Sequence, residues 1–266
     1  MNDIQYHIIK PPAELSDVVR FFWTFEGVAS AEQPYILRTV ANGCPEFLFH
    51  YQGNFEELVH DSKTATSFST GIHGQSDLYR RFIVKEPFGI FGVYLYPFAM
   101  TSIFGIPAIE FTNQLPDLEW VVGRKDNGIT DSMLTARDNQ QRLKLITDYL
   151  LRRKQSPKQK EIAFAVQQVI HHHGAVDIQA LSDQCFRSHR QFERNFKEQT
   201  GFTAKKFSRI IRFNSLMHTR KNAHASLTQI ALDFGYYDQS HFIHDFKSFS
   251  GYSPGTYFSG KANELM

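Results

Sequence analysis

Residues 230–257 read IALDFGYYDQSHFIHDFKSFSGYSPGTY, and this stretch decides the fold of the C-terminal part of the chain. Ile230, Ala231 and Phe234 recur at the spacing of one helical face. Gly235 follows directly and supplies the backbone freedom that a sharp turn between two packed helices needs. The first half of the stretch therefore predicts a helix that ends in a tight turn.

A second helix is predicted after that turn. Asp238 is a suitable N-cap because its carboxylate accepts from the free backbone N–H groups of a first helical turn. Phe242 and Phe246 follow at i and i+4 and start an apolar stripe that a partner must cover. Gly251 ends the helix, and the Ser-Pro pair at 253–254 begins a third, with proline at the first helical position. This order is typical of a helix-turn-helix unit.

A second copy of the pattern lies about fifty residues upstream, where residues 188–207 read SHRQFERNFKEQTGFTAKKF. The matching positions are Phe192, Phe196, Lys197, Gly201, Phe202, Thr203 and Phe207, against Phe242, Phe246, Lys247, Gly251, Tyr252, Ser253 and Tyr257. Residues 178–185 are expected to form the preceding helix, and Ser188 with Gln191 predicts a capping box. Phe186 stands where the other copy has glycine, so a looser or different first turn is expected.

Together these residues resemble the C-terminal hallmark of the AraC/XylS family of bacterial transcription regulators. The resemblance rests on Gly235, Tyr236, residues 238–242, Phe246, Lys247, Gly251, Ser253, Pro254 and Tyr257. It implies a sequence-specific transcription regulator whose main partner is double-stranded DNA. Two units in one chain can reach successive major grooves, whose faces recur about every 34 Å. A small-molecule effector of unknown identity, RNA polymerase and a second copy of the chain are further candidate partners.

Helical geometry separates the outer side of each expected recognition helix from its buried side. Successive residues turn by about 100°, so positions opposite Phe192 and Phe242 point outward. The resembled family contacts bases from several of these positions. The candidate DNA-binding residues are Arg190, Glu193, Arg194, Lys197, Gln239, Ser240, Ile243, His244 and Lys247.

Side-chain chemistry suggests a role for each candidate. Arg190 or Arg194 suits guanine, Glu193 suits the cytosine amino group, Gln239 suits adenine, and Ile243 suits the thymine methyl group. Lys197 and Lys247 are expected to hold phosphates, helped by Lys205, Lys206, Arg209 and Arg212. The alternative is that these residues form ordinary solvated helix faces.

The first 130 residues are expected to be β-rich, with strands near 21–25, 35–41, 46–51, 67–72, 78–85 and 90–96. The sequence Asn-Gly-Cys-Pro at 42–45 predicts a hairpin-like link between two of these strands. The segments FGVYLYPFAM and ANGCPEFLF also resemble a sensor-like domain that accompanies some AraC-type DNA-binding domains. The fold class expected is α+β with two domains, of which the N-terminal one is β-rich and barrel-like.

Residues 131–154 carry apolar positions at helical spacing and end in three basic residues, which predicts one amphipathic helix. Such a helix either packs on its own domain or forms a dimer contact. Residues 155–157, Gln-Ser-Pro, then break the helix. We therefore expect a sensor or dimerisation domain over 1–155 and an all-α DNA-binding domain over 157–266.

The charge of the chain is unevenly distributed. Residues 157–266 hold 14 Lys and Arg against 9 Asp and Glu, whereas residues 1–156 hold 15 against 18. A basic C-terminal part suits a polyanionic partner. No membrane-spanning apolar run and no signal peptide is evident, so a cytoplasmic protein without a membrane partner is expected.

Other motifs support neither a metal site nor a cofactor. Three consecutive histidines, His171 to His173, cannot converge on one ion from a helix and are interpreted as a polar helix end. Cys44 and Cys185 are too isolated for a disulfide or metal site. No catalytic constellation is expected. Two alternatives remain: a DNA-localised enzyme that uses Cys44 as nucleophile, and a helical protein-interaction module.

Overall fold

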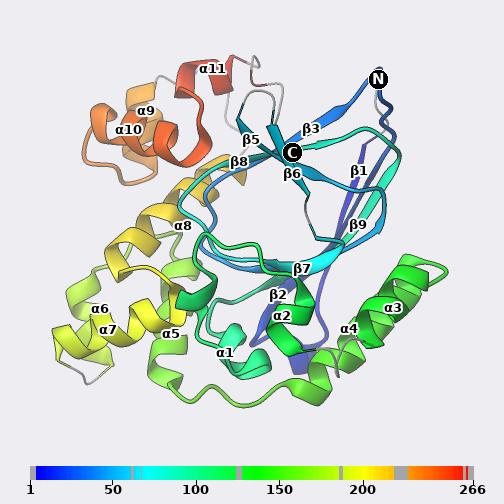
Figure 1. Ribbon diagram of the computed structural model, residues 1–266. Coiled ribbons are helices and arrows are strands. Elements are labelled where there is room, and N and C mark those ends of the chain that lie inside the picture. Colours follow the sequence, from blue (N-terminus) through cyan, green and yellow to red (C-terminus); the bar gives the residue numbers. More distant parts are fainter. Residues whose placement is uncertain are drawn as a thin grey trace.

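The computed structural model describes residues 4–60, 63–66, 68–123, 128–185, 188–218, 227–259 and 262. Within them, the N-terminal part forms two antiparallel sheets (Figure 1). The five-stranded sheet has the order β1 (Gln5–Ile9), β2 (Val19–Gly27), β9 (Phe88–Leu95), β4 (Glu46–Gln52) and β7 (Thr70–His73). The four-stranded sheet has the order β3 (Tyr35–Thr39), β8 (Arg80–Val84), β5 (Glu56–His60) and β6 (Lys63–Thr66).

Both faces of the five-stranded sheet are apolar, because helices pack on one face and the four-stranded sheet packs on the other. Along β4, Phe47 and Phe49 belong to the core on the helical side, whereas Leu48 between them belongs to the core between the sheets. Such a split follows from the two-residue period of a strand. On the helical side, Phe47 contacts Phe104 of α1 (Ala99–Phe104) and Tyr149 of α4 (Asn139–Arg153).

The β-rich N-terminal domain is confirmed, and its described strands form two facing sheets and not a closed barrel. The expected hairpin between residues 35–41 and 46–51 is wrong, since β3 pairs with β8 while β4 pairs with β7 and β9. Between the sheets the chain makes an isolated bridge from Asn42 to Ser76. The Asn-Gly pair is not in the positive-φ conformation that a tight hairpin turn needs. The link therefore crosses from one sheet to the other.

The single helix expected over 131–154 is also wrong, because the chain breaks into α3 (Gly128–Thr135) and α4. Asp138 caps α4 by accepting from the backbone N–H of Gln141. Arg142 stabilises the break, since its guanidinium donates to the carbonyls of Met133 and Ala136. Ile146 and Leu150 of α4 are fully buried within this domain, the first of the two expected placements.

Helix α2 (Leu118–Val122) precedes α3 in the chain. The helices after α4 are α5 (Lys160–His171), α6 (Ile178–Gln184), α7 (His189–Thr200), α8 (Ala204–His218), α9 (Leu227–Asp233), α10 (Gln239–Ser250) and α11 (Pro254–Phe258). They lie together on one flank of the strands (Figure 1). Residues 154–159 separate α4 from α5, and the domain boundary there stays a prediction. No described helix has the length and apolar character needed to cross a membrane.

The internal repeat is confirmed in detail. Helices α7 and α10 have 12 residues each, with Ser188 and Asp238 as side-chain N-caps. Both end at a left-handed glycine, Gly201 with φ 80° and Gly251 with φ 74°, a conformation that favours glycine. Phe186, expected to alter the first turn, lies outside the described residues.

Candidate nucleic-acid interface

The two recognition helices expose most of the predicted DNA-binding residues. Those exposed are Arg190, Arg194 and Lys197 on α7 and Gln239, Ser240, His244 and Lys247 on α10. The opposite side of each helix is held by phenylalanines, of which Phe192 and Phe242 have 0% exposed surface. Burial of this apolar side orients each helix with its polar side toward solvent. The structure therefore places these candidates on equivalent faces of two equivalent helices.

Glu193 and Ile243 occupy the same position in the two copies and are half-buried. The Glu193 carboxylate accepts from the backbone N–H of Ala204 at 3.2 Å, at the start of α8. An acidic side chain is favourable there because it meets the positive end of the helix dipole. Cytosine contact by Glu193 stays a prediction, and it competes with this bond.

The two arginines of α8 have partners within the protein. Arg209 donates through Nε to Asp245 at 3.0 Å, and a second, shorter contact makes the pair bidentate. The side chain of Asp245 is fully buried, and its hydrogen bond raises the pKa of Arg209. Arg212 donates to the Gly174 carbonyl at 3.1 Å. Arg209 thus holds α8 to α10, and Arg212 holds α8 to the turn after α5. Lys205, another predicted phosphate-binding residue of α8, is exposed.

The N-terminal domain contacts both helix-turn-helix units at the same structural position, the glycine that ends the recognition helix. A Cβ on Gly201 would collide with Thr112 and Gln75, and a Cβ on Gly251 would collide with Arg38 and with the ring of Tyr79. Each left-handed turn is therefore packed against a loop or strand of the N-terminal domain. We call this pair of contacts the glycine docks.

Hydrogen bonds reinforce both docks. At the second unit, the Ala41 N–H donates to the Phe249 carbonyl at 2.8 Å, and Arg38 donates to the Ser250 carbonyl at 3.2 Å. Near the first unit, Lys206 forms an ion pair with Asp77 at 2.9 Å. Sequence reasoning missed these contacts, although it named Lys206 as a phosphate-binding candidate, because the partners lie more than a hundred residues apart and no local pattern links them.

Between the docks, the connecting helix α8 is also bound to the N-terminal domain. The Asn214 amide donates to the Ala41 carbonyl at 2.7 Å. A Cβ on Gly43 would lie 2.9 Å from atoms of both Phe207 and Ile211, so the backbone of the strand link approaches α8 closely. The two glycine docks and this α8 contact together hold both helix-turn-helix units and their connecting helix against the N-terminal domain.

The motifs set aside in the sequence behave as structural elements. Helix α5 ends at His171, and His173 lies 3.1 Å from the Ser215 hydroxyl through Nδ1, as a polar helix end should. No group of three His, Cys, Asp or Glu residues in the described ranges could hold a metal ion. Cys44 is 1% exposed, and burial raises the pKa of its thiol. This environment disfavours the thiolate that a nucleophile requires.

Comparison with known families assigns each part of the chain separately. Residues 181–260 match a family described as "Helix-turn-helix domain". Residues 7–117 match a family described as "Domain of unknown function (DUF6597)". The first match spans both units, so the C-terminal part is a helix-turn-helix domain of the AraC type.

Among curated proteins, the chain is similar to the HTH-type transcriptional activator RhaS of Escherichia coli O157:H7. The two are 31% identical over 91 residues, which is 34% of this chain and 33% of RhaS. The chain thus matches about a third of the length of this relative.

Two solved structures are similar at lower identity. ToxT from Vibrio cholerae O395 is 13% identical with a TM-score of 0.47, covering 90% of this chain and 97% of ToxT. The DNA-binding domain of AdpA, solved in complex with a target DNA, is 21% identical with a TM-score of 0.35, covering 38% and 91%.

Proposed function

Starting from the AraC-type helix-turn-helix domain of this chain, we propose that the protein is a sequence-specific, DNA-binding transcription regulator. Its helices α7 and α10 enter successive major grooves of one duplex, so that a single chain recognises an asymmetric site of two short boxes. The observation that carries this proposal is the exposure of equivalent polar faces on two equivalent capped helices. Helices of this kind fit the major groove of B-DNA.

Chemistry divides the proposed contacts into two classes. Arg190, Arg194 and Gln239 have side chains that pair bidentately with base edges and would specify sequence. Lys197 and Lys247 would bind phosphates and supply salt-dependent affinity without sequence information. The second unit presents fewer charged groups than the first, and it would depend more on hydrogen bonding and apolar contact.

The N-terminal domain would control this activity through the glycine docks. Because it holds both units, any change in the position of Arg38 or Gln75 alters the relative placement of the two recognition helices. An effector or self-association through this domain would act by the same route. RNA polymerase and a second copy of the chain stay predicted partners.

Selection of bound sequences from a random duplex pool at physiological salt tests the proposal. The full chain should enrich a site of two boxes whose centres lie about 10 bp apart. Arg194→Ala should change the preference at particular bases of one box, whereas Lys197→Ala should weaken all sequences alike. No enrichment by a folded protein would contradict the proposal and favour a protein-interaction module.

A further inference from the structure

One short segment of the N-terminal domain contacts the ends of both recognition helices. Residues 75–79, which we call the brace, lie between β7 and β8. At one end of the brace, the Gln75 side chain packs against Gly201, where a Cβ would lie 2.4 Å from its amide nitrogen. At the other end, the ring of Tyr79 packs against Gly251, where a Cβ would lie 2.7 Å from a ring carbon. The brace therefore connects the two units from outside the helical domain.

The middle of the brace is bound to the connecting helix. The Asp77 carboxylate forms an ion pair with Lys206 at 2.9 Å, near the start of α8. Helix α8 itself connects the two units from inside the helical domain, because it packs on α7 through Phe207 and is ion-paired to α10 through Arg209. Two units joined by one helix can bend or turn about it. A second connection on another side restricts that motion.

The side chain of Asn113 holds the brace in place. Its oxygen accepts from the Ser76 hydroxyl at 2.8 Å and from the Asp77 backbone N–H at 3.1 Å. Its amide nitrogen donates to the Asp77 carboxylate at 2.9 Å. The backbone N–H of Asn113 also donates to the Gln75 carbonyl at 2.9 Å. Asn113 thus bonds to three consecutive residues of the brace.

The backbone of Asn113 is itself in an unusual conformation. Its φ is 61°, and among the described residues other than glycine it shares a positive φ with His173 alone. Such a conformation costs free energy and persists where the surrounding structure holds it. Arg80 supplies part of that hold, since its guanidinium donates to the Asn113 carbonyl at 2.6 Å. The strained residue and the brace are therefore built as one unit.

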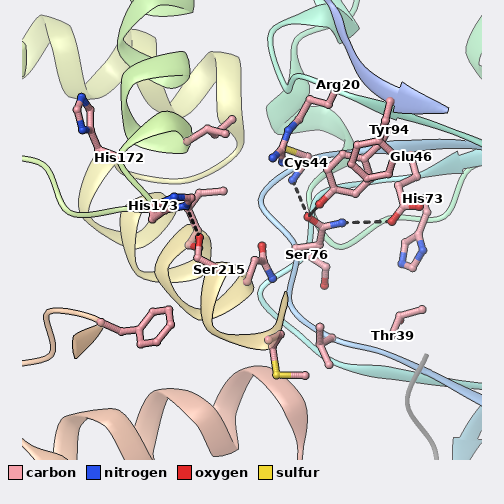
Figure 2. A pocket seen from close by; sticks show the side chains of 18 of the residues that line it. Arg20, Thr39, Cys44, Glu46, His73, Ser76, Tyr94, His172, His173 and Ser215 are labelled. Atoms are coloured by element: carbon pink, nitrogen blue, oxygen red, sulfur yellow. Dashed lines mark hydrogen bonds between the residues drawn. The ribbon is translucent and has the colours of Figure 1, made fainter. Parts of the chain in front are cut away.

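Packing alone does not fix the brace, because one of its residues borders open space. Ser76 lines a cavity of about 960 Å³ between the N-terminal and helical domains, and Figure 2 shows it among the residues of that wall. The Ser76 backbone exchanges two hydrogen bonds with Asn42, at 2.7 and 2.8 Å. Hydrogen bonds from Asn42 and Asn113 thus supply the support that packing does not give on this side.

We propose that the brace, held by Asn113, sets the separation of α7 and α10 and thereby the spacing between the two DNA boxes that the chain accepts. Asn113 is then a positioning residue, which acts through the brace and determines the spacing of the boxes and not their base sequence. One added base pair moves the second box by about 3.4 Å and turns it by about 35°. A frame closed by the brace cannot follow this displacement. The inference rests on the proposed function.

Binding of the full chain to two duplexes tests the proposal: one has the selected spacing, and the other has one base pair inserted between the boxes. For the natural chain, the insertion should lower the affinity at least about tenfold, a difference of about 1.4 kcal/mol. In Asn113→Gly this penalty should fall below about threefold, because glycine keeps the left-handed backbone but removes the three side-chain bonds to the brace. Asn54→Gly, at an exposed asparagine, is the matched control and should keep the full penalty.

Tyr79→Ala is a second variant that acts at the other end of the brace. Tyr79 is 43% exposed, so its truncation leaves the core intact. The change removes the ring that packs against Gly251 and lies 4.9 Å from the Arg38 guanidinium. The spacing penalty should therefore fall in this variant as well, whether or not Asn113→Gly folds.

A full penalty in Tyr79→Ala or in folded Asn113→Gly would overturn the proposal. An equal loss of affinity at both spacings in folded Asn113→Gly would also overturn it, because a merely structural residue weakens both complexes alike. Failure of the natural chain to select a two-box site would contradict the proposed function itself. A two-box site whose spacing penalty is the same in the natural chain and in the variants would overturn the role of the brace alone.

Discussion

The ion pair between Arg209 and Asp245 joins the connecting helix α8 to the second recognition helix, and Asp245→Asn tests its contribution. Removal of one partner from a buried ion pair costs about 3–5 kcal/mol. Arg209 is 27% exposed, so water screens the remaining charge, and asparagine keeps one acceptor oxygen. We therefore expect a loss of about 2 kcal/mol in the free energy of unfolding.

Urea unfolding of the full chain, followed by circular dichroism, measures this loss. Asp183→Asn on α6 is the matched control, because Asp183 is exposed and bonds only to Gln179 one turn away in the described structure. It should cost less than about 0.5 kcal/mol. Combining Asp245→Asn with Arg209→Gln should reveal a coupling of at least about 1 kcal/mol. Strictly additive single effects, or a loss no larger than the control's, would refute the assignment.

Three further changes have definite expected outcomes. Gly251→Ala forces alanine to φ 74° against Arg38, so it should lose about 1–2 kcal/mol or more in free energy of unfolding by urea. Gly255→Ala should lose none, because its added Cβ would meet only the Ser253 hydroxyl oxygen at an ordinary 3.9 Å. The folded pKa of Glu46, about 7, lies above its unfolded value, so the stabilising effect of its protonation is present at low pH and lost as pH rises through 7. Glu46→Gln should therefore gain stability over the natural chain, on the order of 2 kcal/mol, between pH 5 and pH 8, and a constant difference would contradict this. Cys44→Ala should keep the DNA footprint of the natural chain, and loss of a catalytic turnover in this variant would support the enzyme alternative. In the natural chain, the buried Cys44 should resist a thiol reagent until the protein unfolds. A cysteine introduced at an exposed position, Ser16→Cys, is the control and should react at once.

The C-terminal domain was predictable because its determinants are local. Asp238 caps, Phe242 packs and Gly251 terminates within one helix, and each acts through neighbours three or four residues away. The repeat then transfers the same argument to α7. Local signals also located most strands of the N-terminal domain, because apolar alternation depends on the strand alone.

The strand pairing and the helix break were beyond local patterns. β3 and β4 flank a turn-like sequence but pair with strands far along the chain, because each completes a different sheet. The break before α4 depends on Arg142 reaching back to Met133 and Ala136, which a helical spacing rule reads as one continuous helix.

The candidate site divides in the same way. The outward residues of α7 and α10 follow from helical geometry, whereas the capping bond of Glu193 requires the position of α8. The glycine docks needed the structure, since their partners are brought together only by the packing of two domains.

The central claim is that one chain places two recognition helices in successive major grooves at a fixed separation. Inserting 5 bp between the two selected boxes turns one groove about half a helical turn away from the other while leaving both box sequences intact. Binding of the full chain to this duplex should fall at least about 100-fold, to the level of a duplex with one box, a loss of about 2.7 kcal/mol. Unchanged affinity for the 5-bp insertion would contradict the claim.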